Sequence, residues 1–236
     1  MKDKRNDLLV IIPAFNEEEN ICQVVTNLIE KYPQYDYVVV NDGSADNTSR
    51  ICHEEKFNII DLPVNLGLAG AFQTGLKYAD LKNYDCAIQF DADGQHRPEY
   101  IAELVKGIEE GYDIVIGSRF VTQKKPLSMR MVGSRMIGWA IKVSTGKRVA
   151  DPTSGMRMYS KKMIHEFARN INYGPEPDTI SFLVKQGAAI KEVQVEIDDR
   201  TAGESYLNWT KSMMYMLRMM ISILFIQNFR KRSKTD

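Results

Sequence analysis

An Asp-x-Asp loop is the feature of this chain with the clearest chemical potential. Asp91 and Asp93 follow a short apolar stretch, and Gln95 comes two residues later. Their oxygen atoms suit a hard cation such as Mg2+ or Mn2+, which also binds phosphate oxygens. A calcium loop starting at Asp91 is excluded, because His96 stands where such a loop needs glycine and Ala102 where it needs glutamate. The loop therefore indicates metal and phosphate chemistry.

Comparable polar loops follow the other short apolar stretches of the first half of the chain. Turn formation explains Asn, Asp, Gly and Ser in any one such loop. Their recurrence at the end of each stretch favours a binding edge over turns alone. The five loops are residues 13–17, 41–46, 65–67, 91–96 and 118–119.

The elements that must position these loops alternate between strand-like and helix-like patterns. Helical periodicity is predicted for residues 17–31, 46–55, 67–80 and 98–110. The order predicts an α/β fold, with a mainly parallel sheet covered by helices on both faces and ligands bound beyond the carboxyl ends of the strands. The predicted strands are Leu8–Ile12, Tyr37–Val40, Asn58–Asp61, Cys86–Phe90, Asp113–Gly117 and Val193–Ile197.

Charge divides the chain into two unlike halves. The whole chain has 31 basic and 31 acidic residues, so its composition gives no sign of a nucleic-acid partner. Residues 1–118 hold 21 acids and 10 bases, whereas residues 119–236 hold 21 bases and 10 acids. Residues 119–148 contain eight Lys or Arg and no acid. This asymmetry indicates an anionic partner for the second half.

Several classes of protein are excluded by composition and motif. With 44% hydrophobic and 26% charged residues the chain is typical of a globular protein, not of a disordered or collagen-like one. Three separated cysteines without a Cys-x-x-Cys spacing argue against a disulfide framework or a structural zinc site. The glycine patterns of Rossmann dehydrogenases and P-loop NTPases are absent. The apolar run at residues 8–12 is too short for a signal peptide, so we expect a cytosolic protein.

The ordered motifs resemble those of family 2 inverting glycosyltransferases, which have the GT-A fold. Within that family the chain is most similar to the dolichyl- and polyprenyl-phosphate mannosyl- or glucosyltransferases. The resemblance covers residues 8 to 205. Its motifs are specific for the family but much less specific for the sugar that is transferred. The motifs are Pro13-Ala14-Phe15-Asn16-Glu17, Asn41-Asp42-Gly43-Ser44, Asn65-Leu66-Gly67, Asp91-Ala92-Asp93-Gly94-Gln95-His96, Gly117-Ser118-Arg119-Phe120 and Asp151-Pro152-Thr153-Ser154-Gly155-Met156-Arg157.

The resemblance implies a donor site for a nucleotide diphosphate sugar on the acidic half. Asp91 and Asp93 would contact the donor and, together with Gln95, bind Mg2+ or Mn2+ on its diphosphate. The cation would act as a Lewis acid that stabilises the leaving group. Asn41 departs from the family, many of whose members have a first aspartate at this position. The residues implied to hold the base and ribose are Pro13, Ala14, Phe15, Glu17 and Asp42.

The resemblance also implies an acceptor site on the basic half. Arg119, Arg130 and Ser134 match positions that face the phosphate of a polyprenyl phosphate, and Arg157 and Arg200 fall in later basic motifs near the same site. Arginine suits this role because its guanidinium group binds phosphate oxygens in bidentate fashion. After Arg200 the motif departs from close relatives, which often have a lysine where this chain has a tyrosine at position 206.

The choice of acceptor decides whether a catalytic base is needed. A phosphate acceptor is already ionised near neutral pH, whereas a sugar hydroxyl needs a general base. Glu176 and Asp178 lie in a segment that resembles the acidic acceptor-side motif of the family and could supply that base. The same segment also reads as an ordinary proline-started helix with acids at its N-terminus. The candidate catalytic residues are Asp91, Asp93, Arg119, Glu176, Asp178 and Arg200.

The C-terminal segment is predicted to be an amphipathic helix. We expect residues 1–205 to form the catalytic domain and residues 206–236 to form a basic helix too short in its apolar run to span a bilayer. A membrane-surface helix is favoured, with an oligomer or small membrane-partner interface and an ordinary core helix as alternatives. Residues 127–145 form a second candidate interfacial helix. The apolar stripe is Met213, Met216, Leu217, Met220, Ile221, Leu224 and Phe225.

The expected function is metal-dependent, inverting sugar transfer to a polyprenyl (undecaprenyl or dolichyl) phosphate at the cytoplasmic face of the membrane, by a peripheral enzyme. The first alternative is transfer to a hydroxyl of a lipid-linked, capsular or cell-wall glycan. The second is a catalytically weak scaffold that binds a membrane partner. A sugar nucleotidyltransferase is disfavoured, because its first loop rich in glycine and lysine is absent.

Overall fold

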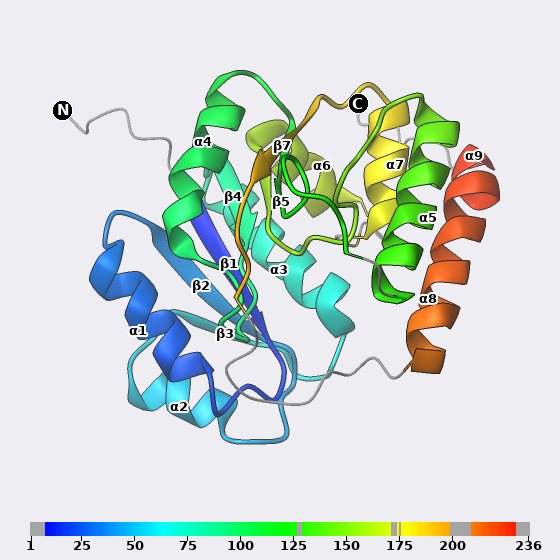
Figure 1. The fold of residues 1–236 in the computed structure, drawn as a ribbon. Coiled ribbons are helices and arrows are strands. Elements are labelled where there is room, and N and C mark those ends of the chain that lie inside the picture. Colours follow the sequence, from blue (N-terminus) through cyan, green and yellow to red (C-terminus); the bar gives the residue numbers. More distant parts are fainter. Residues whose placement is uncertain (1–7, 127–128, 171–173, 175, 199–208, 230–236) are drawn as a thin grey trace.

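The structure is a computed structural model, and it describes residues 8–126, 129–170, 174, 176–198 and 209–229. A seven-stranded sheet runs through the molecule in the order β3-β2-β1-β4-β6-β5-β7 (Figure 1). Strand β6 is antiparallel to β4 and β5, and the other described pairs are parallel. The strands are β1 Leu8–Ala14, β2 Asp36–Asn41, β3 Ile59–Asp61, β4 Cys86–Gln89, β5 Ile114–Ser118, β6 Arg157–Ser160 and β7 Ile190–Gln194.

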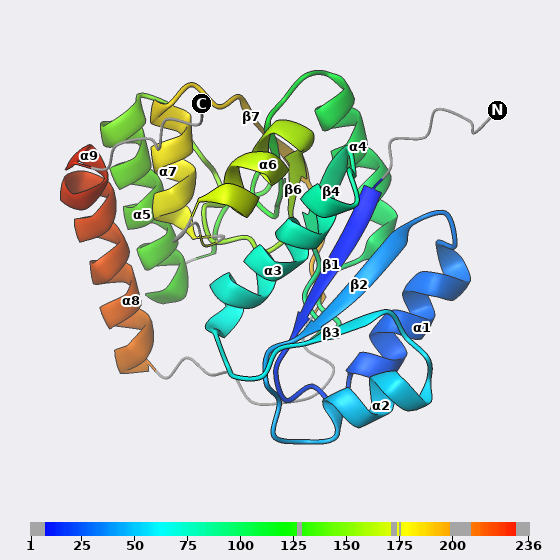
Figure 2. The same ribbon diagram turned by 180° about the vertical axis from the view of Figure 1, so that it is seen from behind.

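Helices cover both faces of the sheet (Figures 1 and 2). Helices α1, α2 and α4 bury their apolar sides on one face, and α3, α5, α6, α7 and α8 contribute to the core on the other. The predicted α/β fold with a mainly parallel sheet is therefore confirmed. The helices are α1 Ile21–Lys31, α2 Thr48–Glu54, α3 Gly67–Leu81, α4 Ile101–Glu109, α5 Met129–Thr145, α6 Lys161–Arg169, α7 Pro177–Lys185, α8 Trp209–Ile221 and α9 Gln227–Phe229, with a 3-10 turn at Pro98–Tyr100 and a π-helix at Ser222–Ile226.

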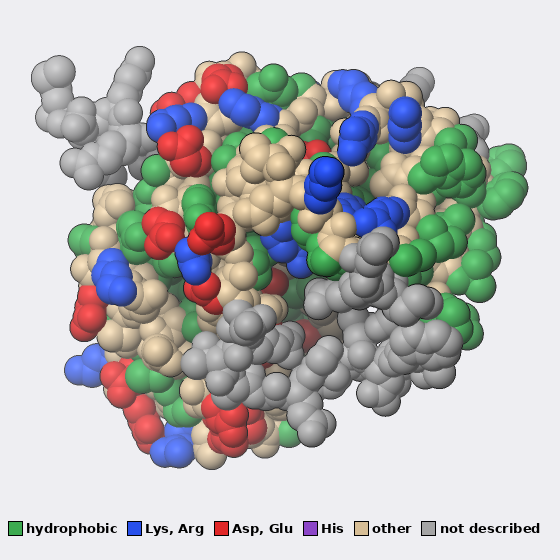
Figure 3. Space-filling view, viewed as in Figure 1, with side chains coloured by type: hydrophobic (Ala, Val, Ile, Leu, Met, Phe, Trp, Pro, Cys, Tyr) green, Lys and Arg blue, Asp and Glu red, His purple; other side chains and the backbone are tan. Residues whose placement is uncertain are grey.

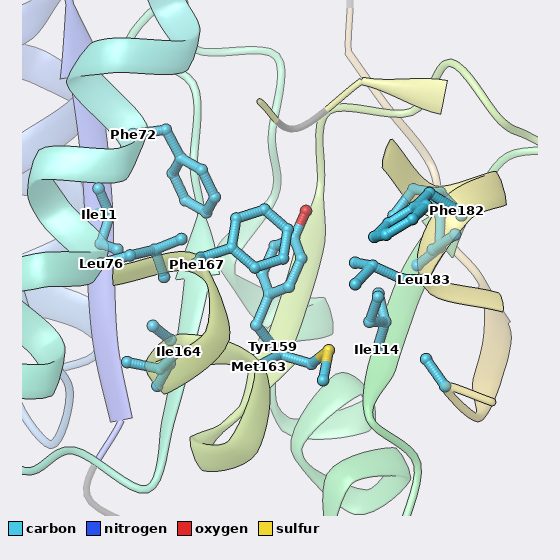
Figure 4. Close-up of a cluster of buried hydrophobic side chains, with 14 of the residues drawn as sticks. Ile11, Phe72, Leu76, Ile114, Tyr159, Met163, Ile164, Phe167, Phe182 and Leu183 are labelled. Atoms are coloured by element: carbon cyan, nitrogen blue, oxygen red, sulfur yellow. The ribbon is translucent and has the colours of Figure 1, made fainter. Parts of the chain in front are cut away.

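The central strand β1 shows why the sheet is buried on both faces. All seven of its residues are buried, and alternate side chains enter opposite cores. Tyr159 of β6 lies in the core beneath α3 and α6, with its ring 5.5 Å from that of Phe72 and 5.0 Å from that of Phe167 (Figure 4). These aromatic contacts fix the middle of the sheet, from which the functional loops project.

The structure differs from the sequence prediction at two strands. Strand β6 was not expected, because its first residue is the charged Arg157 and its neighbours lack strand periodicity. The strand predicted at Val193–Ile197 is present, but its bounds are wrong by three residues, since β7 is Ile190–Gln194. Beyond that point the chain leaves β5 and crosses to the Asp-x-Asp loop, where Ile197 forms an isolated bridge with His96.

The C-terminal helices pack as a layer at one end of the molecule. Helix α8 lies against α5, and the π-helix after it contacts α5 and α7. Met219 and Ile223 are buried there, so they form the inner side of the helix. Met213, Leu217, Ile221 and Phe225 of the predicted stripe are 45–63% exposed. Among the described residues, no helix has the length and apolar content needed to cross a membrane.

Candidate active site

The donor-side loops are tied together at the carboxyl ends of β1, β2 and β3. Asp42 is 3% exposed; its backbone N–H donates to Ala14 O at 2.8 Å, and its Oδ1 accepts the N–H of Leu66 at 2.7 Å. Gly43 has φ +66°, and a Cβ there would lie 2.8 Å from the backbone N of Asn65. Only glycine allows the second and third loops to approach this closely. The edge predicted from the sequence is thus a single interlocked surface.

The first loop is held by the loop after β2. Asn16 adopts φ 56°, its N–H donates to Ser44 Oγ at 3.0 Å, and its Oδ1 accepts the N–H of Ala45 at 2.8 Å. The N–H of Glu17 donates to Thr48 Oγ1 at 2.9 Å. Three residues of the predicted nucleotide contacts therefore have well-defined places: Pro13 and Ala14 are buried at the end of β1, and the half-buried Phe15 follows them.

The hydrogen bonds of Asn41 explain why this chain has asparagine where many family members have aspartate. Its Nδ2 donates to Asp61 Oδ1 at 2.7 Å, while its Oδ1 accepts the N–H of Ser44 at 3.2 Å. An aspartate at position 41 would place a second carboxylate against that of Asp61, and like charges at this distance repel. The asparagine thus serves the loop by donating and accepting at once, which a carboxylate does not do.

Asp91 of the Asp-x-Asp loop is oriented by three groups. Gln89 Nε2 donates to its Oδ1 at 2.9 Å, and its own backbone N–H donates to Nδ1 of His96 at 2.9 Å. The other ring nitrogen of His96 lies 3.5 Å from Asp91 Oδ2. Because the histidine side chain is only 3% exposed and packs edge-on against Phe90, its ring is fixed. This role of His96 was not predicted from the sequence.

Asp93 and Gln95 continue the loop and join it to the chain after β7. Asp93 Oδ1 accepts the N–H of Gln95 at 3.1 Å. Gln95 Nε2 donates to the carbonyl of Asp198 at 3.1 Å, and Arg97 forms ion pairs with Asp198 and Glu196. The loop therefore has defined backbone positions on both sides of the two aspartates.

The residues of this loop fit a divalent cation shared with a diphosphate. Among the described residues no group of three or more His, Cys, Asp or Glu could enclose a metal. Mg2+ is usually held by one or two carboxylates together with substrate phosphates and water, not by a full protein cage. The Asp91 carboxylate packs closely on Gly155, where a Cβ would lie 2.6 Å from Asp91 Oδ2, so only glycine allows this position of the carboxylate. Asp91, Asp93 and Gln95 supply the oxygen donors such an ion prefers.

Among the residues predicted for the acceptor site, Arg119 is fixed by a buried carboxylate. Asp151 accepts hydrogen bonds from Nε of Arg119 at 2.7 Å and from its Nη2 at 2.9 Å, and the Asp151 side chain is fully buried. Burial opposes ionisation, but the hydrogen bonds and charge of Arg119 outweigh it and hold the pKa of Asp151 below its usual value. Glu192 in turn accepts the N–H groups of Ala150 and Asp151 at 2.6 and 2.8 Å.

Ser134 lies in the same network. Lys125 Nζ donates to Ser134 Oγ at 2.8 Å, and the hydroxyls of Ser134 and Thr153 are 3.4 Å apart. Burial lowers the pKa of Lys125. The Lys125 ammonium and the Arg119 guanidinium both lie over the ring of Phe120, at 5.3 and 5.1 Å from its centroid. Lys125 and Asp151 were not singled out from the sequence, although Asp151 opens a quoted motif.

Of three further residues predicted for the acceptor site, one is buried and the side chains of the other two are not described. Arg157 is 2% exposed, and its Nη2 donates to the carbonyl of Pro152 at 2.7 Å, so its side chain lies inside the protein. Arg130 is in the first turn of α5, but its side chain is not among those described. Arg200 lies outside the described residues. The roles of all three remain predictions.

The two acidic candidates for a general base have different surroundings. Asp178 Oδ2 accepts hydrogen bonds from Ser222 Oγ at 2.6 Å and Gln227 Nε2 at 3.0 Å, so this carboxylate fastens the C-terminal helices to α7. Glu176 occupies the N-cap position of α7 without a side-chain capping hydrogen bond, and it is half-buried. Burial and the nearby Asp178 raise the pKa of Glu176, against the opposing charge of Arg218. Glu176 is therefore the carboxyl group better prepared to hold a proton.

Residues 151–155 bring the donor and acceptor sets together. Asp151 binds Arg119 and Thr153 contacts Ser134, while Gly155 lies against Asp91 at the other end of this short segment. In Figure 3, Lys and Arg side chains gather toward the side of α5 and α7, and acidic side chains lie mainly over α1, α2 and α4. An anion placed between Asp91 and Arg119 would therefore meet the carboxylate loop on one side and fixed cations on the other.

Sequence comparisons identify relatives over most of the chain. The family described as glycosyl transferase family 2 matches residues 9–167. A UDP-N-acetylglucosamine–dolichyl-phosphate N-acetylglucosaminyltransferase of Methanococcus voltae is 32% identical over 213 residues, covering 80% of this chain and 84% of its own. An undecaprenyl-phosphate mannosyltransferase of Micrococcus luteus is 28% identical over 214 residues, covering 85% and 87%.

A solved structure shows the same architecture. Glucosyl-3-phosphoglycerate synthase from Mycobacterium tuberculosis, in complex with Mn2+, UDP and glucosyl-3-phosphoglycerate, aligns with a TM-score of 0.65 at 20% identity. The alignment covers 97% of this chain and 82% of the synthase. This likeness agrees with the predicted GT-A fold. From the family match and the interlocked donor edge, we conclude that the chain belongs to glycosyl transferase family 2 and is a glycosyltransferase of the GT-A type.

Proposed function

We propose that this enzyme transfers a sugar, with inversion, from a nucleotide diphosphate sugar to a polyprenyl phosphate. The observation that carries the proposal is the placement of Arg119 and Ser134 beside the Asp-x-Asp loop by the segment 151–155. The relatives named for dolichyl-phosphate and undecaprenyl-phosphate substrates, which match four fifths or more of the chain, support it.

On the donor side, the interlocked loops bind the nucleotide of the donor. Asp42 and the residues at the end of β1 form the floor for base and ribose, and Asp91, Asp93 and Gln95 hold Mg2+ or Mn2+. The bound cation would stabilise the negative charge that develops on the departing nucleotide diphosphate. His96 and Gln89 fix the orientation of the Asp91 carboxylate, which limits reorganisation during the reaction.

On the acceptor side, Arg119 and Ser134 hold the phosphate so that one of its oxygens attacks the anomeric carbon opposite the leaving group. The oxygen is already ionised, so the step needs no proton acceptor. Asp151 takes up two donors of Arg119 and presents the rest of the guanidinium in a fixed direction. Positioning two anionic reactants between cations supplies much of the catalytic effect.

Transfer to a sugar hydroxyl is the second candidate, and one observation favours it. Glu176 has a raised pKa from burial and from Asp178, which is the property expected of a general base. A phosphate acceptor does not need this group. The effect of removing the Glu176 carboxyl group therefore separates the two acceptors.

We also propose that the enzyme acts at the cytoplasmic face of the membrane, as a peripheral protein. Val132, Met136, Trp139 and Val143 of α5 are 40–58% exposed on one side of the helix. The exposed residues of α8 and the π-helix extend the apolar surface, because α8 packs on α5. Helices of this kind bind in the interface of a bilayer. The alternative, an oligomer or membrane-protein partner on the same surface, would show as a change in molecular mass in solution.

The test is a panel of UDP- and GDP-sugars with Mn2+ or Mg2+, offered in parallel with short polyprenyl phosphates and with a lipid-linked glycan as hydroxyl acceptor. Lipid products are measured by mass. The proposal predicts one glycosyl phosphate lipid from a preferred donor, formed only when a divalent cation is present. A product on a glycan hydroxyl with no lipid phosphate product would support the second candidate instead.

A further inference from the structure

A basic cavity lies beside the acceptor site. It has a volume of about 670 Å3 and opens between the loop at residues 120–125 and helix α5. None of the described residues that line it is acidic. Its wall contains Ser134 and Trp139, and its cations are Lys124, Lys125, Arg135, Lys142 and Arg148.

The cavity is too long for a single phosphate group to use all of its cations. Ser134 and Lys142 are eight residues apart on α5, which corresponds to about 12 Å along the helix axis. A hydrogen bond from nitrogen to a phosphate oxygen spans only about 3 Å. A phosphate bound by Ser134 and Lys125 therefore lies about two helical turns from the backbone of Lys142, which with Arg148 supplies further cations to the cavity.

The cations at the two ends are also engaged differently. Lys125 donates to Ser134, and Arg135 Nη2 donates to the carbonyl of Lys125 at 2.7 Å, so these two side chains are part of the acceptor network. Lys142 and Arg148 are exposed, and within the described part of the chain neither forms an ion pair. Cations gathered around one cavity repel one another unless an anion enters.

The apolar surface of α5 and α8 indicates which anion is available. Trp139 is 57% exposed; it belongs to the apolar side of α5 and also lines the cavity. Tryptophan at such a boundary is typical of the level of lipid head groups. A bilayer resting on the apolar surface would therefore bring its phosphate groups to the mouth of the cavity.

We propose that the Lys142 and Arg148 end of the cavity binds the phosphate head group of an anionic phospholipid, in addition to the acceptor phosphate held at the Ser134 end. This inference rests on the membrane-surface part of the proposed function. The lipid stays chemically unchanged. Its role is to hold α5 at a fixed depth in the interface, with the acceptor site open toward the lipid phase.

The test compares the double variant Lys142→Gln/Arg148→Gln with a control, Lys77→Gln/Lys147→Gln. The control removes two exposed Lys charges from positions that do not line the cavity. Flotation with vesicles of phosphatidylcholine, with and without phosphatidylglycerol, measures binding. We expect the cavity variant to bind the anionic vesicles about 10- to 30-fold more weakly than the wild type, and the control to change by less than about 3-fold. Binding to pure phosphatidylcholine should be the same for all three proteins.

Two further measurements separate this inference from the proposed function. In detergent with saturating polyprenyl phosphate, both double variants should keep wild-type turnover, because Arg119, Ser134 and the Asp-x-Asp loop are intact. A raised KM for polyprenyl phosphate in the cavity variant would assign these cations to the acceptor and overturn the inference, while leaving the proposed function in place. Equal losses of vesicle binding in both variants, or no loss in either, would also overturn it. Displacement of the protein from vesicles by inorganic phosphate, at concentrations comparable to that of the lipid, would overturn the inference as well.

Discussion

The loop edge proposed to bind the donor and the basic side proposed to bind the acceptor are held together by different forces. At the donor edge, short hydrogen bonds between neighbouring loops fix the backbone, as between Asp42 and Leu66 or Asn16 and Ser44. On the acceptor side, charged side chains hold one another in place, as Asp151 holds Arg119. The donor edge is therefore a property of the sheet and its turns, whereas the acceptor side depends on a buried ion pair.

This difference predicts how each side fails when a residue is removed. Loss of the Asp93 carboxylate should remove chemistry and leave the fold intact, because the hydrogen bond that it accepts from the N–H of Gln95 lies within its own loop. Loss of an acceptor-side charge should reduce activity and stability together, because its partner is left buried and unpaired.

The largest effect is expected for Asp93→Ala. Removing one of two carboxylates from the proposed cation site should lower transfer more than about 1,000-fold, since stabilisation of the leaving diphosphate is lost. Transfer is measured with Mn2+ or Mg2+, and the melting temperature is followed by circular dichroism. Asp36→Ala, at the opposite end of β2, is the control and should keep near-normal activity. Retained transfer in Asp93→Ala that still requires the metal would contradict the assignment.

Arg119→Ala should lower both the transfer activity and the stability of the protein. Breaking a buried pair by removing one partner costs about 3–5 kcal/mol of unfolding free energy, because Asp151 remains buried without its counter-charge. Denaturant unfolding measures this loss. The double variant Arg119→Ala/Asp151→Ala should recover part of the stability but none of the transfer. If the single variant is as stable as the wild type, the ion pair does not hold the acceptor side together.

The same pair gives a smaller effect that depends on pH. The pKa of Asp151 is lower in the folded protein than the value of about 3.9 in the unfolded chain. The pair therefore stabilises the protein fully above that value, and its contribution is lost as the pH falls through the folded-state pKa. The difference in stability between wild type and the double variant Arg119→Ala/Asp151→Ala, which lacks the titrating carboxyl group, should be constant from pH 7 to 5 and shrink below about pH 4, as measured by denaturant unfolding. A difference that stays constant through this acid range would argue against a charged Asp151.

The smallest effect is expected for Glu176→Gln. A phosphate acceptor needs no general base, so transfer to polyprenyl phosphate should fall by less than about 10-fold, whereas loss of a true base costs about 100- to 10,000-fold. Initial rates with saturating donor measure the change. Asp178→Asn is the matched variant, and it should loosen the C-terminal helices because Ser222 and Gln227 lose an ionised acceptor. A loss of transfer rate of about 100-fold or more in Glu176→Gln, without a similar loss in Asp178→Asn, would favour a hydroxyl acceptor.

The same contrast explains what could be predicted from the sequence. The donor edge was predictable because turn residues such as Asp42 and Asp91 stand directly after their strands, so local chemistry reveals them. The hydrogen bonds that join the loops of the donor edge span 24 to 31 positions, the Arg119–Asp151 pair spans 32, and the Asp178–Ser222 bond spans 44. No local pattern encodes such pairs. Strand β6 was missed for a related reason, since its Arg157 is buried by tertiary contacts that the sequence does not display.

The central claim is that the basic side receives a phosphate and not a hydroxyl. The most direct measurement offers wild-type enzyme the same donor and metal with a short polyprenyl phosphate or with the corresponding polyprenol, and determines the mass of the lipid product. The account predicts a glycosyl phosphate lipid from the first acceptor and no product from the second. Glycosylation of polyprenol at a comparable rate would contradict it.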